Sequence, residues 1–202
     1  MTYRPKILAF AGSLRKDSYN KKMVKIAIQG AKQAEADVTY IDLKDYPLPL
    51  YDQDLEESQG IPENAQKLKD LFLQHDGFLI ASPEYNSSIS GTFKNVIDWV
   101  SRPRPNEPYL CCFMDKIVML MSASPGELGG LRGLVHVRSL FSNIFSIVLP
   151  QQKCIPKADQ AFDANGSLKD EKQQQAVQKL GEQLTQFLVK YKSADNLVGQ
   201  SR

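Results

Sequence analysis

Apolar residues gather in five short runs that are separated by stretches with helical spacing. Three of the runs are continuous rather than alternating, which indicates strands buried on both faces, as in a parallel sheet covered by helices. The five runs span residues 7–11, 38–43, 77–81, 117–121 and 145–149. Between and after them, apolar positions three and four residues apart predict amphipathic helices. The expected helices span residues 21–34, 63–74, 93–100, 131–141 and 171–189.

This alternation predicts one three-layer α/β domain, in which helices cover both faces of a parallel sheet. A chain of 202 residues suits one such domain. We expect the domain to span residues 1–192 and a polar C-terminal tail to span 193–202. Two long connections, 44–62 and 102–114, are rich in proline and tyrosine. Loops of this length commonly cover a site or form an interface.

Charge and cysteine content narrow the class of protein. The formal net charge is only +2, which gives no electrostatic case for a nucleic-acid or anionic membrane partner. No apolar run approaches the roughly 20 residues that span a bilayer, and the first run is too short for a secretory signal. These features predict a cytoplasmic protein. The odd count of three cysteines, with two histidines and no CxxC spacing, argues against disulfides and metal sites.

The loop after the first predicted strand carries groups suited to an anion. It reads Gly12-Ser13-Leu14-Arg15-Lys16-Asp17-Ser18-Tyr19-Asn20. Ser13 and Ser18 offer hydroxyl groups, and Arg15 offers a charged fork that matches phosphate. Asn20 is the expected N-cap of the following helix, whose N-terminus favours negative charge. A terminal monophosphate fits such a loop, although an ordinary polar turn would share these residues. The loop lacks both G-x-G-x-x-G and G-K-[ST].

Two further loops follow the third and fourth predicted strands. In the first of them, Pro83 stiffens the chain, Tyr85 can lie beside a flat ring, and backbone N–H groups near Asn86 can reach a polar ring edge. The other loop, 122–130, has small residues that let the backbone approach a ligand closely. Either loop alone could be an ordinary turn. Ligands of open parallel sheets bind at the carboxyl ends of the strands. An anion site and two ring-sized clefts there indicate a phosphorylated planar ligand, such as flavin mononucleotide (FMN).

These motifs resemble the NADPH-dependent FMN reductase family, which includes chromate, quinone and azo-dye reductases. The matching residues, within about 6–150, are the first loop, Pro83-Glu84-Tyr85-Asn86, Lys94-Asn95-Val96-Ile97-Asp98-Trp99, and Ser122-Ala123-Ser124-Pro125-Gly126 with Gly129-Gly130. One departure is Ser90, where the family often has proline. The resemblance implies a flavodoxin-like fold, with a five-stranded sheet of order 2-1-3-4-5 and FMN at the switch point.

The resemblance also implies which residues bind the cofactor. It assigns four residues of the first loop to the phosphate, namely Ser13, Arg15, Ser18 and Asn20. It assigns residues 83–86 to the isoalloxazine side and residues 122–126 to the third loop of the site. The twelve expected residues are Ser13, Arg15, Ser18, Tyr19, Asn20, Pro83, Glu84, Tyr85, Asn86, Ser122, Ser124 and Gly126. For Glu84, a structural role is an equal alternative.

The implied activity is a ping-pong oxidation of NADPH or NADH through bound FMN. The small-molecule electron acceptors suggested are quinones, azo compounds, free flavin and oxidised metal ions. Hydride transfer needs alignment more than an acid or base, so we expect no catalytic side chain and no metal. His75 is expected to cap a helix and His136 to be packed or at the surface. Arg102 or Arg104 could meet a nucleotide phosphate, but a solvated pair is the simpler interpretation.

Other classes of protein remain as alternatives. An FMN-binding electron carrier without its own substrate should be strongly acidic for docking, and this chain is nearly neutral. A redox-sensing interaction protein is compatible with the same cofactor. A serine hydrolase lacks support because the G-x-S-x-G pattern is missing. The resemblance further implies a homodimer or homotetramer.

Overall fold

A computed structural model describes residues 3–199, with side chains described as far as Ser193. Its centre is a sheet of five parallel strands in the order β2-β1-β3-β6-β7. The strands are β1 (Lys6–Ala11), β2 (Asp37–Tyr40), β3 (Gly77–Ala81), β6 (Ile117–Ala123) and β7 (Ile147–Ile155). Numbered along the chain within this sheet, the order is 2-1-3-4-5. This confirms the predicted flavodoxin-like topology.

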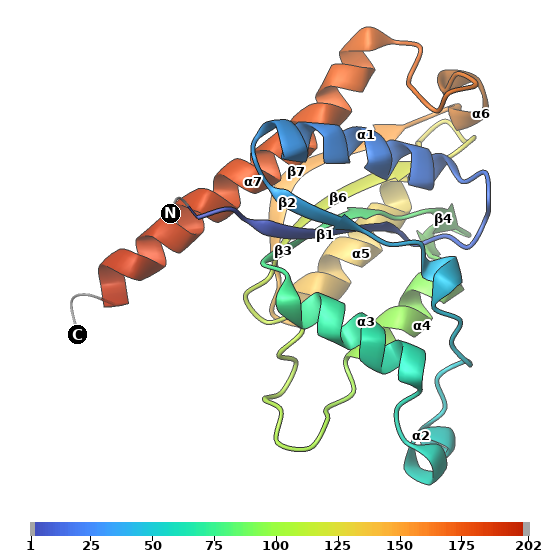
Figure 1. Ribbon diagram of the computed structural model, residues 1–202. Coiled ribbons are helices and arrows are strands. Elements are labelled where there is room, and N and C mark those ends of the chain that lie inside the picture. The colour runs from blue at the N-terminus through green and yellow to red at the C-terminus, as the bar shows by residue number, and fades with distance from the viewer. Residues whose placement is uncertain (1–2, 200–202) are drawn as a thin grey trace.

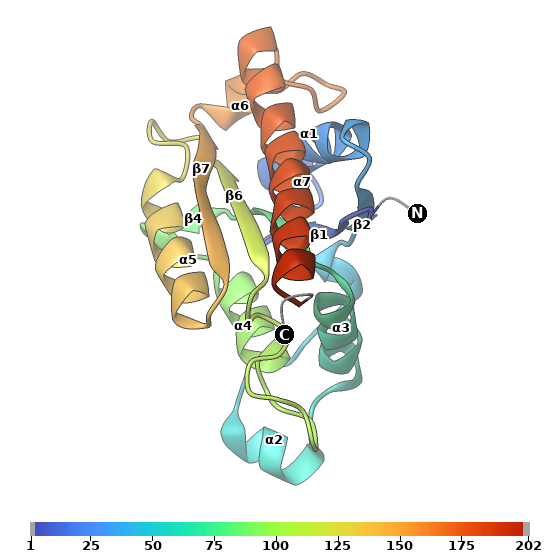
Figure 2. The ribbon, with the colours of Figure 1, turned by 90° about the vertical axis from the view of Figure 1, so that its left-hand side faces the viewer.

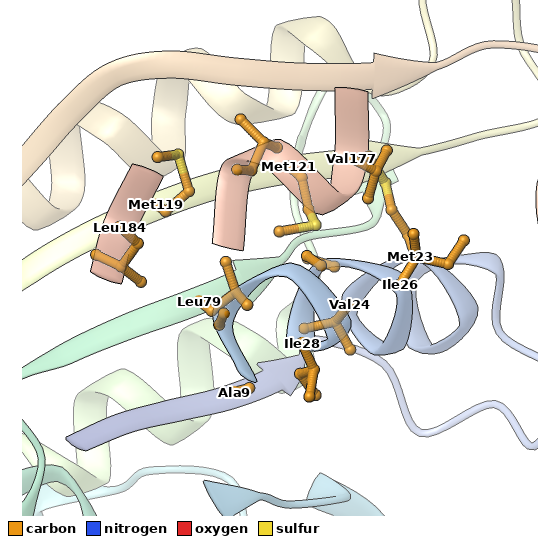
Figure 3. Packing of buried hydrophobic residues seen from close by; sticks show 14 of the residues in the cluster. Ala9, Met23, Val24, Ile26, Ile28, Leu79, Met119, Met121, Val177 and Leu184 are labelled. Atoms are coloured by element: carbon orange, nitrogen blue, oxygen red, sulfur yellow. The ribbon is translucent and has the colours of Figure 1, made fainter. Parts of the chain in front are cut away.

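Helices cover both faces of the sheet (Figures 1 and 2). One face carries α1 (Tyr19–Gln33) and α7 (Glu171–Gly199), and the other carries α3 (Glu63–Gln74), α4 (Gly91–Val100) and α5 (Leu131–Asn143). Because strand side chains alternate, Ala9 packs under α1 while Leu8 and Phe10 pack on the opposite face. Figure 3 shows Met119 and Met121 of β6 against the α1–α7 layer. Both faces of the central strands are therefore buried, as their continuous apolar runs predicted.

Several element limits differ from the predicted ones. The second strand ends at Tyr40, since Asp42 accepts a hydrogen bond from the backbone N–H of Lys44 and starts the short 3-10 helix η1 (Leu43–Asp45). The last strand begins after Phe145, which has a positive φ of 63° in the preceding turn. Helix α7 continues through Gly199, past the expected domain limit at residue 192. The rest of the predicted tail, residues 200–202, lies outside the described residues.

Besides η1, four short elements were not predicted. They are α2 (Gln53–Gln59), the hairpin strands β4 (Glu84–Tyr85) and β5 (Ser88–Ile89), and α6 (Ala158–Ala161). Helix α2 has no buried residue, so it lacks the apolar stripe by which helices are recognised. The hairpin strands have two residues each, too few to show an alternating pattern.

Hydrogen bonds fasten the two long connections to the body of the domain. Asn95 and Trp99 of α4 both donate to the carbonyl oxygen of Pro49, at 2.9 and 2.8 Å. In the second connection, the buried ammonium group of Lys69 donates to the carbonyl oxygen of Val100 at 3.3 Å and lies 3.0 Å from a carboxylate oxygen of Glu107. Neither connection is therefore a free loop. No helix in the described part of the chain has the length and apolar character needed to cross a membrane.

Candidate cofactor site

The loops that follow β1, β3 and β6 meet at the carboxyl edge of the sheet, where β4 is labelled in Figure 1. They enclose a cleft of about 190 Å³. Of the predicted site residues, nine line this cleft: Ser13, Arg15, Ser18, Tyr19, Asn20, Pro83, Glu84, Tyr85 and Ser124. Ala123 and Pro125 complete it. Asn86, Ser122 and Gly126 do not line it.

The first loop is held against the first turn of α4. A Cβ atom on Gly12 would lie 2.9 Å from the Cβ of Phe93, so only glycine fits at this contact. The buried hydroxyl group of Ser90 donates to the carbonyl oxygen of Gly12 at 2.7 Å. The hydroxyl oxygen of Ser90 also accepts from the backbone N–H of Phe93 at 3.2 Å and caps α4. The departure from proline at position 90 therefore supplies a hydrogen bond between two loops of the site.

The donors of the first loop fit a phosphate group. The hydroxyl oxygens of Ser13 and Ser18 accept from backbone N–H groups at 3.3 and 3.4 Å, which leaves each hydroxyl hydrogen free to donate. The guanidinium group of Arg15 is solvent-exposed and has no carboxylate partner within residues 3–199. No acidic residue occupies the first turn of α1, so the positive end of its dipole is not neutralised there.

The prediction that Asn20 is the N-cap of the first helix was wrong. The N-cap of α1 is Ser18, and Asn20 is buried inside the helix. Its Nδ2 donates to the carbonyl oxygen of Ala123, and its Oδ1 accepts from the backbone N–H of the same residue, both at 2.9 Å. Both ends of the amide are thus used to join the first loop to the third. Serine and asparagine are equally good N-cap residues, so their types alone do not show whether Ser18 or Asn20 caps the helix. Only the contact of Asn20 with Ala123, which is distant in the sequence, distinguishes the two roles.

The second loop is a hairpin that docks on α5. Its turn residues Asn86 and Ser87 have φ of 50° and 64°, the positive values of a type I′ turn. Asn86 consequently lies at the tip of the hairpin, outside the cleft. Glu84 accepts from the backbone N–H of Gly133 at 2.7 Å, in the first turn of α5. Negative charge is favoured at this end of a helix, so the contact supports the structural interpretation of Glu84.

Ser122 and Gly126, in the third loop, lie outside the cleft. The Ser122 side chain is fully buried, and its hydroxyl group donates to the carbonyl oxygen of Ser82 at 2.6 Å. Gly130, with φ of 90°, packs so closely that a Cβ atom there would overlap this hydroxyl. Ser122 is thus a packing residue beneath the cleft. Ser124 does face the cleft, and its hydroxyl oxygen accepts from the backbone N–H of Gly126 at 3.2 Å.

The two arginines after α4 are also not free for a ligand. Arg104 forms ion pairs with Asp70 and Glu107, each at 2.7 Å. Arg102 donates to the phenol oxygen of Tyr51 at 3.2 Å. The interpretation of these arginines as a solvated pair was wrong, since both stabilise the long connections.

The histidines and cysteines have no role in the cleft. His75 is the C-cap of α3, as predicted, with Nδ1 2.6 Å from the carbonyl oxygen of Leu71. His136 lies on the exposed side of α5, 2.8 Å from the hydroxyl of Ser88. All three cysteines are free. Burial raises the pKa of Cys112 to about 12 and that of Cys154 to about 11, so both thiols stay protonated at neutral pH.

The fold and the site together define a class of protein. A doubly wound parallel sheet reverses its strand order between β1 and β3, and the loop that follows β1 lies at this switch point. This is the arrangement of flavodoxin-like proteins. The chain belongs to the NADPH-dependent FMN reductase family, whose sequence model matches residues 5–160.

Individual relatives support this assignment over most of the chain. An NAD(P)H-dependent FMN reductase of Pseudomonas aeruginosa is 35% identical over 176 residues, covering 86% of this chain and 89% of the relative. An NAD(P)H:quinone oxidoreductase of Solanum tuberosum is 35% identical over 181 residues, covering 85% and 87%. Among solved structures, a flavoenzyme NAD(P)H:(acceptor) oxidoreductase of Paracoccus denitrificans matches with a TM-score of 0.74 and 27% identity, covering 92% of this chain and 98% of the other.

These similarities confirm the predicted family and class of enzyme, an oxidoreductase of the NAD(P)H-dependent FMN reductase and quinone reductase type. Membership brings a flavin and a reduced nicotinamide into the chemistry of the protein.

Proposed function

We propose that the cleft binds FMN, with its phosphate at Ser13, Arg15 and Ser18. The observation that carries the proposal is the exposed Arg15, which has no carboxylate partner among the described residues and lies beside two hydroxyl groups that can still donate, at the N-terminus of α1. Charge-assisted hydrogen bonds of this kind are the strong ones in phosphate recognition. The isoalloxazine ring would lie between Pro83 and Tyr85 on one side and Ser124 on the other, since these residues line the same cleft.

The cleft is built to hold a ligand rather than to donate protons. Bound FMN supplies hydride acceptance and release, which is chemistry of the cofactor itself. The chain contributes position: Asn20 ties the first loop to Ala123, and Ser90 ties it to α4. No histidine lines the cleft, and Glu84 is bound to the first turn of α5. Protons would therefore be exchanged with solvent at the open side, where Tyr85 is 52% exposed.

The proposed reaction is ping-pong hydride transfer from NADPH or NADH to an electron acceptor. A quinone is favoured as acceptor, because the potato relative is named a quinone oxidoreductase. Azo compounds, free flavin and oxidised metal ions are further candidates. We also propose a cytoplasmic homodimer or homotetramer. Support for assembly comes from the exposed Leu128, Leu131 and Val135 beside the hairpin, because exposed apolar patches commonly mark interfaces.

The test is a visible spectrum followed by turnover. Protein incubated with FMN and freed of excess cofactor should be yellow, should bleach on anaerobic addition of NADPH, and should recover its colour with benzoquinone. Steady-state oxidation of NADPH by benzoquinone then separates an enzyme from an electron carrier, because a carrier would show no sustained turnover. Protein that stays colourless after incubation with FMN would contradict the proposed cofactor.

A further inference from the structure

A second cavity adjoins the cofactor cleft and has a different chemical character. It encloses about 480 Å³, within the range of small-molecule sites, and shares Ser18 with the cleft. Its walls are the outer side of α1, the end of β2 and the turn at residues 164–167. Figure 1 shows α1 between β2 and the turn that follows α6. The charged residues of the cavity are Lys16, Asp17, Lys21, Lys22, Lys25 and Asp42.

Within the described part of the chain, three of the four lysines of this cavity have no anionic partner. Lys21 is buried and pairs with Asp42 at 2.6 Å, so these two charges cancel. No carboxylate within the described residues pairs with Lys16, Lys22 or Lys25. The exposed carboxylate of Asp17 offsets one of these three charges. The cavity consequently keeps a positive balance next to the proposed phosphate loop.

Aromatic rings keep two of these ammonium groups near the cavity. The Nζ atom of Lys22 lies 5.8 Å from the centre of the Tyr19 ring, and the Nζ atom of Lys25 lies 5.4 Å from that of the Tyr40 ring. Cation–π contacts of this length restrain a cation without neutralising its charge. Both lysines therefore remain available to an anion while their side chains have lost part of their freedom.

We infer that this cavity receives the 2′-phosphate of NADPH. The inference rests on the proposed function, since it needs the nicotinamide to reach a flavin in the adjoining cleft. The 2′-phosphate is the group that distinguishes NADPH from NADH, and lysine ammonium groups bind phosphate as point charges. Arg102 and Arg104, the other candidates for this contact, are engaged with Tyr51, Asp70 and Glu107. The lysine cavity would thus set a preference for NADPH.

The experiment compares the two nucleotides on the FMN-loaded enzyme. In the double variant Lys22→Ala/Lys25→Ala, kcat/KM for NADPH should fall by about two- to fivefold for each lysine removed, the scale of an exposed ion pair. The value for NADH, which lacks the phosphate, should stay within about twofold. The control is Lys32→Ala, which removes the same charge from the same helix but does not line the cavity. An equal fall for both nucleotides, or no change for NADPH, would overturn the inference.

A binding measurement that needs no turnover tests the inference separately from the proposed function. Calorimetric titration should show that adenosine 2′,5′-bisphosphate binds more tightly than adenosine 5′-monophosphate, and that the double variant loses the difference. If inorganic phosphate alone binds as well as the bisphosphate, the cavity is a general anion site and the assignment to the nucleotide is wrong. Failure of the FMN test would leave the titration result interpretable, because it needs neither cofactor nor hydride transfer.

Discussion

Asn20→Asp offers the sharpest test of the clamp between the first and third loops, by which we mean the pair of hydrogen bonds between the Asn20 amide and the Ala123 backbone. The wild-type amide gives one hydrogen bond to Ala123 and receives another, both at 2.9 Å and both buried. A carboxylate keeps the accepted bond but places a charged oxygen against the Ala123 carbonyl. An unsatisfied buried acceptor costs about 1–3 kcal/mol, and a buried charge adds to this. We expect the free energy of unfolding to fall by about 3 kcal/mol at pH 7.

The pH dependence of the stability of this variant shows whether the introduced carboxyl group is buried against Ala123. Burial and the Ala123 carbonyl should raise the pKa of the introduced carboxyl in the folded state. The neutral form of this carboxyl can donate to the Ala123 carbonyl. The variant should therefore regain stability as the pH falls toward about 3.9, the pKa of an aspartate in the unfolded chain. It should lose that stability as the pH rises through the raised pKa of the folded state. Urea unfolding at pH 7 and pH 5, each against wild type, measures the difference.

A matched control and a clear refutation accompany this prediction. Asn106→Asp makes the same chemical change at an exposed position whose side chain has no hydrogen bond within the described structure, and it should shift unfolding by less than about 0.5 kcal/mol. Equal stability of Asn20→Asp and wild type would refute the clamp. Loss of FMN binding in Asn20→Ala with unchanged stability would return Asn20 to the predicted phosphate role.

Three further changes test other parts of the molecule. Arg15→Ala should weaken FMN binding by about 1.5–3 kcal/mol, measured by fluorescence titration, with the urea midpoint unchanged. Ser87→Gly should raise the free energy of unfolding by about 0.5–1 kcal/mol, because glycine adopts the positive φ of this turn position without strain. Glu107→Gln should make stability fall less steeply in acid. Burial raises the pKa of Glu107, but hydrogen bonding to Lys69 outweighs it, so the pKa is lowered overall. Wild type therefore loses the stabilisation by this carboxylate as the pH falls below about 4.5.

Each of these has an outcome that would count against its premise. Unchanged FMN affinity in Arg15→Ala would mean that the guanidinium points away from the cofactor. A lower melting temperature for Ser87→Gly would mean that the serine hydroxyl makes a contact that outweighs backbone strain. Parallel acid-unfolding curves for wild type and Glu107→Gln would mean that the carboxylate has the same pKa in both folded and unfolded states.

Long apolar patterns in the sequence predicted the sheet and its helices well. The helix at 63–74 and the strand at 77–81 have the predicted limits, because Pro62 precedes the helix and the strand is a continuous apolar run that is buried throughout. Helix α2 was missed although Asp52 caps it and acidic residues fill its first turn. Those start signals were present, but a short exposed helix has no apolar face to confirm them.

The sequence predicted which residues gather at the cleft better than it predicted the contacts that their side chains make. Residue types at the carboxyl ends of the strands pointed to one edge of the sheet, where nine of the expected residues line one cleft, since topology alone brings these loops together. What each side chain touches depends on partners far away in the chain: Asn20 meets Ala123 across 103 positions, and Ser122 turns inward beneath Gly130. Local spacing carries no information about such pairings, so the N-cap role expected of Asn20 was wrong and the buried position of Ser122 was not foreseen.

The hydrogen bond from Ser90 to Gly12 has a consequence for how fast a ligand enters. Outward movement of the first loop must break this buried bond, although the Ser90 oxygen can still accept from the backbone N–H of Phe93 and cap α4. Because the bond holds the first loop in place without a ligand, we expect the cleft to be formed before FMN arrives and no opening step to precede association. Stopped-flow mixing with FMN should give a single exponential whose rate rises linearly with FMN concentration, and Ser90→Ala should introduce a plateau set by loop motion.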